Sequence, residues 1–333
     1  MPAPLPRPLR WAVAVAVLGA AVLLSLFLGA RTIGPGTTLE ALLAAGGSRD
    51  HTIVRELRLP RTLLGLAVGA ALAVAGGLMQ GLTRNPLASP EVLGIGNGAA
   101  FAVVLAIYLA GITSPAGYVW FAIAGAGSSA VLVYLLASAG TRAVTPVRLA
   151  LSGAVLATAA LSWTSTVMTL DDRTLDEARF WLAGSLAGRP LGVLWTVLPV
   201  LAVGAVLAAL LIRPLDALAL GDDSAASLGV DPLRSRLLGA VAVTLLAGGA
   251  VAAAGPIAFI GLAAPHLARQ VFGAGHRALL PACALLGPAL LLLADVVGRL
   301  VLIPLELEVG IVTSLLGAPL LIGLARRARL VAT

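Results

Sequence analysis

Long apolar runs constrain this chain more than any other feature of its sequence. A run of about 20 apolar residues is long enough to cross a bilayer as a helix, and such runs recur along the whole chain. Hydrophobic residues make up 59% of the sequence and charged residues only 11%. A soluble domain carries about 25% charged residues, so this chain lacks the polar surface of a water-soluble globule. The sequence therefore predicts an all-α polytopic membrane protein.

Ten segments fit this pattern, and we expect them to form a single transmembrane domain over residues 1–333. They are residues 11–30, 60–82, 92–110, 115–138, 146–169, 191–212, 236–254, 257–268, 277–301 and 308–325. The eighth is too short to cross fully. It predicts a half-length helix near 257–268 that is enclosed in the bundle, since irregular backbone at membrane depth has to be buried in protein.

Three polar segments separate the spans at residues 31–57, 170–190 and 213–235, and the first includes a short helix predicted near residues 37–45. The first span could instead be a signal peptide, because arginines precede it and an Ala-rich stretch follows. Its length of about 20 residues exceeds the roughly 7–15 of a signal-peptide core. We therefore expect a retained first helix.

Arginine predicts the orientation of the chain. If the N-terminus is cytoplasmic and the spans alternate, most of the 22 basic residues lie inside, which the positive-inside rule favours. Those on the inner side are Arg7, Arg10, Arg84, Arg142, Arg148, Arg213, Arg234, Arg236, Arg269, Arg277, Arg326, Arg327 and Arg329. Both termini are then cytoplasmic, and the net charge of +7 is explained by topology rather than by binding to nucleic acid.

The residue types present in the sequence argue against an ATPase site and a metal site in this chain. All the basic residues are arginine, and a P-loop needs a lysine to reach the phosphates, so this chain is not itself a Walker-type ATPase. Its three histidines, His51, His266 and His276, are scattered and predict no metal site. Cys283 is a single cysteine in an apolar run and reads as a small packed residue.

Four stretches carry information beyond hydrophobicity. They are residues 57–62 with 69–80, 84–90 with 93–99, 255–269, and 293–295 with 306–319. In this order and spacing they resemble the FecCD-type family, the permease subunits of ABC importers for ferric siderophores, heme and vitamin B12. The resemblance extends over residues 50–325.

The resemblance implies ten helices per subunit and a homodimer or pseudo-dimer with a second permease subunit. It also implies two cytoplasmic ABC ATPases, which would hold the ATP and magnesium, and an extracytoplasmic substrate-binding protein. We therefore expect this chain to bind no cofactor, to be a transport subunit rather than an enzyme, and to lie in a bacterial plasma (inner) membrane.

Residues 221–229 lie in the 213–235 segment, which this orientation places in the cytoplasm. They look like part of the two short helices by which such permeases dock on the ATPase, although the pattern alone also fits an ordinary polar loop. Small alanines permit close backbone approach, an aspartate can cap the first short helix, and a glycine can end it in a left-handed turn. The residues assigned to this coupling are Asp222, Asp223, Ala225, Ala226 and Gly229.

Arg58 and Arg61 flank a proline at the outer end of the second span, and Arg299 lies near the outer end of the ninth. In the resembling family, arginines in this motif meet acidic residues of the binding protein, and arginine suits such carboxylate pairing. The alternative is that they only reach the membrane interface. Asp295, four residues before Arg299, could form an i,i+4 pair with it.

The resemblance also places the cytoplasmic gate at two turns. The first is Asn85-Pro86-Leu87, where the proline ends the helix and the asparagine side chain can satisfy freed backbone groups. The second lies near Thr145 and Pro146. A plain helix-ending turn is the competing interpretation for both.

Residues 180–189 look more like siderophore permeases than vitamin B12 permeases, so ferric siderophore is the predicted cargo. Heme or cobalamin remains the alternative within the family. An ion-coupled secondary transporter is disfavoured because it needs acidic residues within the spans, and only Asp295 lies near a span interior. A membrane enzyme is disfavoured because the acidic residues are otherwise confined to loops.

Overall fold

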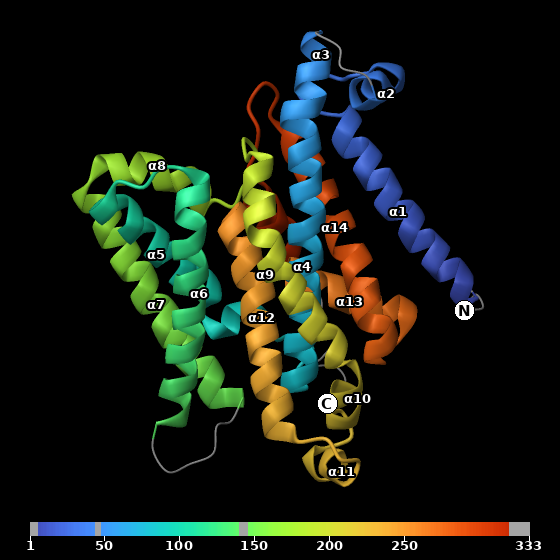
Figure 1. Cartoon of the computed structure of the whole chain (residues 1–333), viewed down its shortest axis with the longest axis vertical. Helices are drawn as coiled ribbons and strands as arrows, with labels where there is room; N and C mark the ends of the chain where they lie inside the picture. The colour runs from blue at the N-terminus through green and yellow to red at the C-terminus, as the bar shows by residue number, and fades with distance from the viewer. Residues whose placement is uncertain (1–5, 44–47, 140–145, 320–333) are drawn as a thin grey trace.

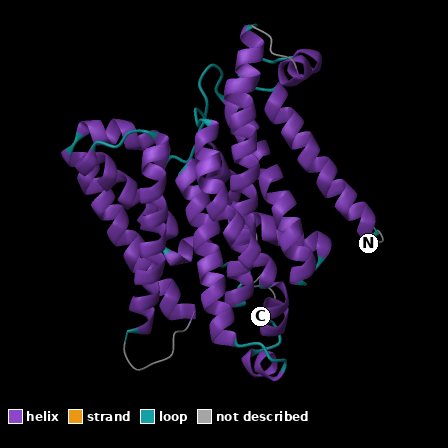
Figure 2. Ribbon diagram, viewed as in Figure 1, coloured by secondary structure: helices purple, strands orange, loops and turns teal. Residues whose placement is uncertain are grey.

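The computed structural model describes residues 6–43, 48–139 and 146–319, and all regular structure in these residues is helical (Figure 2). The long apolar helices are α1 (Arg7–Phe27), α4 (Leu59–Thr83), α6 (Pro115–Ser138), α7 (Pro146–Leu170), α9 (Leu191–Leu210), α12 (Pro232–Ala254) and α14 (His276–Val301). Shorter ones are α5 (Ile95–Ala110), α13 (Ile260–Phe272) and a helix at Val309–Pro319, called the last helix below.

These helices confirm the prediction of an all-helical polytopic membrane protein. Seven of the described helices are long and apolar enough to cross a membrane, and the three shorter ones fall where spans three, eight and ten were predicted. The part of the tenth prediction beyond residue 319 lies outside the described residues.

Short helices occupy the predicted polar segments, at the two ends of the bundle (Figure 1). They are α2 (Pro35–Leu43), α3 (Arg49–Thr52), η1 (Ile53–Arg58), α8 (Asp172–Leu182), α10 (Ile212–Leu218) and α11 (Asp222–Ser227), while a further short helix, η2 (Pro90–Leu93), lies between α4 and α5. α2, α3 and α8 lie at one end, here called the α8 end, whereas α10 and α11 lie at the other, the α11 end. The alternation of spans predicted from arginine requires this separation.

α4 and α12 lie at the centre of the bundle, and α1 and α7 lie at its edges (Figure 1). In the most apolar stretch of the helix that contains α4, 72% of the residues are buried, against 22% for α1 and 17% for α7. Lipid tails are as apolar as leucine, so exposed apolar side chains on the edge helices face a compatible solvent. Central helices instead need small residues to pack closely.

The tightest approach of α4 to its neighbours occurs at glycines. A Cβ atom at Gly76 would lie 1.8 Å from the carbonyl oxygen of Gly261 in α13, and one at Gly69 would lie 2.6 Å from Cα of Pro288 in α14. Both distances are far below van der Waals contact. The glycines of α4 therefore set how closely α13 and α14 can pack against it.

The half-length helix follows a break in the chain. α12 ends at Ala254, and α13 begins after Phe259, which has a φ of 70°. Neighbouring loops satisfy part of the backbone next to this break: the Ser185 amide donates to the Ala254 carbonyl at 2.7 Å, and the Gly310 amide donates to the Gly184 carbonyl at 2.9 Å. The break is thus enclosed by protein, as predicted, but α13 starts three residues later and extends to Phe272.

The first predicted span is a helix of the bundle. It forms α1, which packs along α14 and contacts α13 through the rings of Trp11 and Phe272, whose centroids lie 4.4 Å apart at a tilt of 45°. Trp163 and Trp195 are exposed, whereas Trp181 is buried and packs edge-on against Tyr118. Trp181 therefore belongs to the packed core of the bundle.

The close approach at Gly76 predicts a selective effect of one methyl group. We expect Gly76→Ala to destabilise the protein by about 1–3 kcal/mol, because overpacking forces the backbones apart. Gly127→Ala on α6 is the matched control, since a Cβ atom there would meet nothing within 4 Å. The thermal unfolding midpoints of both variants in detergent check this; equal midpoints would contradict the packing argument.

Candidate functional site

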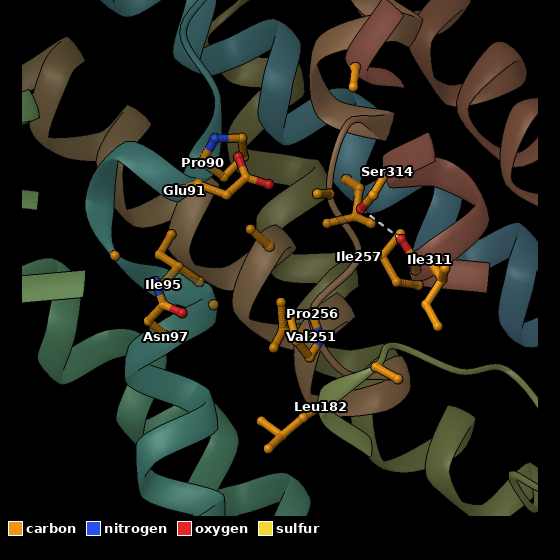
Figure 3. A pocket seen from close by; sticks show the side chains of 18 of the residues that line it. Pro90, Glu91, Ile95, Asn97, Leu182, Val251, Pro256, Ile257, Ile311 and Ser314 are labelled. Atoms are coloured by element: carbon orange, nitrogen blue, oxygen red, sulfur yellow. Dashed lines mark hydrogen bonds between the residues drawn. The ribbon is translucent and has the colours of Figure 1, made fainter. Parts of the chain in front are cut away.

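A cavity of about 730 Å³ opens between α4, α5, α12 and the last helix. Figure 3 shows its wall, which consists mainly of aliphatic side chains such as Val251, Ile257 and Ile311. Glu91, Asn97 and Ser314 supply polar atoms, and the Ser314 hydroxyl donates to the Gly310 carbonyl at 2.8 Å. Ligand cavities of about 300–1,000 Å³ with mostly apolar walls and a few polar groups are typical of small-molecule sites.

Much of the cavity wall comes from places where a helix starts or breaks, namely η2 with the start of α5 and the break between α12 and α13. The rest comes from α4, α12, the end of α8 and the last helix from Gly310 to Pro319. Backbone that is not helical at membrane depth is tolerated where it lines a cavity or is covered by protein. The motifs that carry the family resemblance at residues 93–99, 255–269 and 306–319 therefore meet around one space.

A charged cluster lies towards the α8 end, where α4 meets α14. The Asp295 carboxylate accepts from Nη2 of Arg61 at 2.8 Å and from Nη2 of Arg299 at 2.6 Å. Arg61 also donates from Nη1 to Glu306 at 2.6 Å. Both oxygens of the buried Asp295 therefore carry guanidinium partners, and the predicted pair with Arg299 is confirmed.

Two arginines of this region hold the C-terminal end of α1. Arg58 donates from Nη1 to the carbonyls of Leu26 and Phe27 at 2.7 and 2.8 Å. Arg299 donates from Nη1 to the carbonyls of Ser25 and Leu28 at 2.9 and 3.1 Å. The last carbonyls of a helix have no partner within it, so these arginines complete the hydrogen bonding of α1 and fix it to α4 and α14.

The three arginines assigned to docking are buried, with exposures of 5% for Arg58, 9% for Arg61 and 3% for Arg299. Their donors point inward, to Asp295 and to the end of α1. Docking through them remains a prediction, but in this arrangement they do not project from the surface. Sequence reasoning gave no role to Glu306, whose side chain is 35% exposed beside Arg61.

At the α11 end, the segment predicted to couple to the ATPase forms the two short helices α10 and α11. Ala225 is buried against Ala217 and Leu218 of α10, whereas Asp223 and Ala226 are exposed. Gly229 has a φ of 79°, which is the left-handed conformation predicted for the glycine that ends this short helix. No side chain caps α11, so the predicted capping role of Asp222 or Asp223 is wrong.

Asp222 instead forms ion pairs. Its carboxylate accepts from Arg84, at the end of α4, and from Arg236 of α12 at 2.9 Å. Partial burial raises the pKa of Asp222, but the hydrogen bond from Arg236 and the charges of both arginines outweigh it, so its pKa lies below the usual value. Sequence reasoning missed both partners; Arg84 is 138 residues away in the chain.

The first predicted gate turn is well defined. Arg84 ends α4 in a left-handed conformation, with φ of 50°. Oδ1 of Asn85 then accepts from the Leu87 amide at 3.0 Å, so the asparagine side chain satisfies an amide next to Pro86 rather than a freed carbonyl. Of the second turn, Thr145 lies outside the described residues, and Pro146 is the first residue of α7.

The histidines are separate from one another. Nδ1 of His276 lies 2.7 Å from Asp216 of α10, whose carboxylate also accepts from the His276 amide at the start of α14. His266 lies 2.8 Å from Gln270. Among the described residues, no group of three or more His, Cys, Asp or Glu side chains could hold a metal ion. The pair with Asp216 therefore serves to fasten α10 to α14.

The charged cluster predicts a difference between its two acidic members. Asp295→Asn should destabilise the protein by about 3–5 kcal/mol, because it leaves two buried guanidinium groups without a countercharge. Glu306→Gln should cost about 1 kcal/mol or less, because that side chain is partly in water. Thermal unfolding of both variants in detergent measures the difference, and equal losses would show that Asp295 does not hold the cluster together.

The chain is similar to transport proteins of known type. The chain is 48% identical to the ferric enterobactin transport system permease protein FepD of Escherichia coli (strain K12), over 92% of each chain. It is 41% identical to the iron(3+)-hydroxamate import system permease protein FhuB of Bacillus subtilis (strain 168), over 92% of this chain and 80% of the relative.

A solved structure shares the fold. It is described as a metal-chelate type ABC transporter in an inward-facing conformation, and it matches with a TM-score of 0.83 and 30% identity over 96% of this chain and 99% of that chain. The sequence profile of the FecCD transport family matches residues 17–327. Together with the shared motifs around the cavity, these matches show that the chain belongs to the FecCD transport family.

Proposed function

We propose that this chain is the membrane-spanning subunit of a binding-protein-dependent ABC importer that moves ferric siderophores into the cytoplasm. The observation that carries the proposal is the cavity formed by the family's own motifs, in a chain whose relatives are named for transport of ferric enterobactin and iron(3+)-hydroxamate. Another relative is named for Fe(3+)-citrate import. Iron held by an organic chelate is common to all three.

The cavity suits cargo of this kind because its wall is mainly aliphatic and offers few fixed charges. Iron already saturated by its chelate needs no ligands from the permease. An apolar wall binds such cargo weakly, which lets it leave again, so the binding protein would supply most of the selectivity. Heme and cobalamin are also large chelates and remain the alternative cargo within the family.

ATP hydrolysis has to take place on another subunit, because this chain has no lysine for a P-loop. The segment around α10 and α11 offers a docking surface for an ATPase, because Leu220 after α10, Leu228 after α11 and Leu233 at the start of α12 are all exposed. We assign the ATPase contact to this surface. A second permease subunit would close the open side of the cavity beside Ile311 and Leu315, which are both exposed on the last helix.

An ion-coupled mechanism is less consistent with the structure. The one acidic residue predicted near a span interior, Asp295, has both oxygens occupied by arginines. A proton or cation site in a transporter needs a carboxylate with a free oxygen that faces the pathway. The geometry around Asp295 supports a fixed structural pair instead.

The proposal predicts ATP-dependent uptake. Proteoliposomes that contain this chain, its ATPase and its binding protein should accumulate radioactive iron supplied as a hydroxamate or catecholate chelate when ATP is present. A non-hydrolysable ATP analogue should not support this accumulation. Labelled heme and labelled cobalamin serve as competing cargoes. Accumulation of either in place of iron chelate would assign the alternative cargo, and uptake driven by a proton gradient without ATP would overturn the mechanism.

Docking of the binding protein through Arg61 predicts the sign of one mutational effect. Glu306 holds a donor of Arg61 and would compete with an acidic residue of the binding protein for it. Glu306→Gln should therefore tighten docking, by about fivefold if the exposed pair contributes about 1 kcal/mol. Binding of the purified binding protein to the full complex measures this. Unchanged or weaker binding would show that Arg61 has only a structural role.

A further inference from the structure

Asp222 connects three elements that lie far apart in the sequence. It is the first residue of α11, and it takes hydrogen bonds from Arg84 at the end of α4 and from Arg236 near the start of α12. The side chains of all three residues are between 41% and 44% exposed. Ion pairs in water at this level of exposure are weak enough to break and form again.

α11 is otherwise only lightly attached to the bundle. Its buried residue, Ala225, belongs to a small apolar cluster with Ala217, Leu218 and Val230, which is separate from the main core. The main core ends at Leu215 of α10 on this side. The ion pair of Asp222 with Arg84 therefore joins this small cluster to the end of α4, and its pair with Arg236 joins the cluster to α12.

Arg84 leads directly to the cavity. After the turn at Asn85, where the asparagine side chain accepts from the Leu87 amide, the chain enters η2. Pro90 and Glu91 of η2 line the cavity, and both are labelled in Figure 3. A shift of Arg84 would thus act on a short, hydrogen-bonded turn that leads into the cavity wall.

We propose that Asp222 is a positioning residue that transmits movement of the ATPase-docking segment to the turn at residues 84–87 and to the cavity wall at residues 90–91. The proposal rests on the proposed function. In the structure the carboxylate bridges Arg84 and Arg236; in the second arrangement that we propose, it keeps Arg236 and releases Arg84. An ATPase that displaces α11 changes the balance between these two arrangements. The turn at residues 84–87 is held in place in the first arrangement and released in the second.

The test places a reporter on the turn. A fluorophore attached to Leu87→Cys reports the surroundings of an exposed side chain, and the native Cys283 is fully buried and does not compete for the label. The labelled chain is assembled with its ATPase in nanodiscs, and the fluorescence change on adding ATP is measured. Arg84→Gln and Asp222→Asn are each compared with Arg277→Gln, which removes an exposed charge at the start of α14 that is not one of the two arginines paired with Asp222.

We expect the ATP-dependent change to fall by about fivefold in Arg84→Gln and in Asp222→Asn, in line with loss of an ion pair worth about 1 kcal/mol, and to stay unchanged in Arg277→Gln. The double variant should be no worse than either single one, because residues that act as a unit are not additive. A full-sized change in either variant, or losses that add, would overturn the proposal.

The outcome is separable from that of the proposed function. If the unaltered complex binds ATPase and shows the fluorescence change but takes up no iron chelate, the cargo assignment fails while the link through Asp222 stands. If it transports iron chelate and the variants keep the full change, the link fails and the transport function stands.

Discussion

The close backbone contact between α4 and its neighbours is the constraint on which the remaining structure depends. In lipid, burying leucine provides no driving force between helices, so association relies on close packing and on polar contacts. Gly76 and Gly69 bring α4 against α13 and α14 at distances that no other side chain would permit. That contact fixes the break before α13, and the break in turn forms one wall of the cavity.

Ionic contacts at the two ends of the bundle have different characters. At the α8 end, Asp295 is fully enclosed and both of its oxygens are paired with arginine, which suits a permanent joint between α1, α4 and α14. At the α11 end, Asp222 shares two arginines in contact with water, which suits a joint that changes. Aspartate–arginine pairs thus form a fixed joint where they are buried and an adjustable joint where they are exposed to water.

Much of this could be predicted from the sequence, because a membrane limits the possible answers. Apolar runs located the spans, and the short eighth run identified the half-length helix. The pair of Asp295 with Arg299 followed from helical spacing. The partners of Asp222 could not be foreseen, since Arg84 lies 138 residues away and only the folded chain brings them together. The burial of Arg58 and Arg61 was missed for a related reason: their acceptors are backbone carbonyls and distant acids, which leave no local signal.

The hold of Arg58 and Arg299 on the end of α1 has a consequence for the order in which the helices assemble. Both guanidinium groups belong to helices that follow α1 in the chain, and their acceptors are the carbonyls of residues 25–28. Until α1 is beside them, α4 and α14 carry buried cations with too few acceptors. If α1 and the remainder of the chain are expressed from two separate genes, the two fragments should therefore assemble with each other in the membrane.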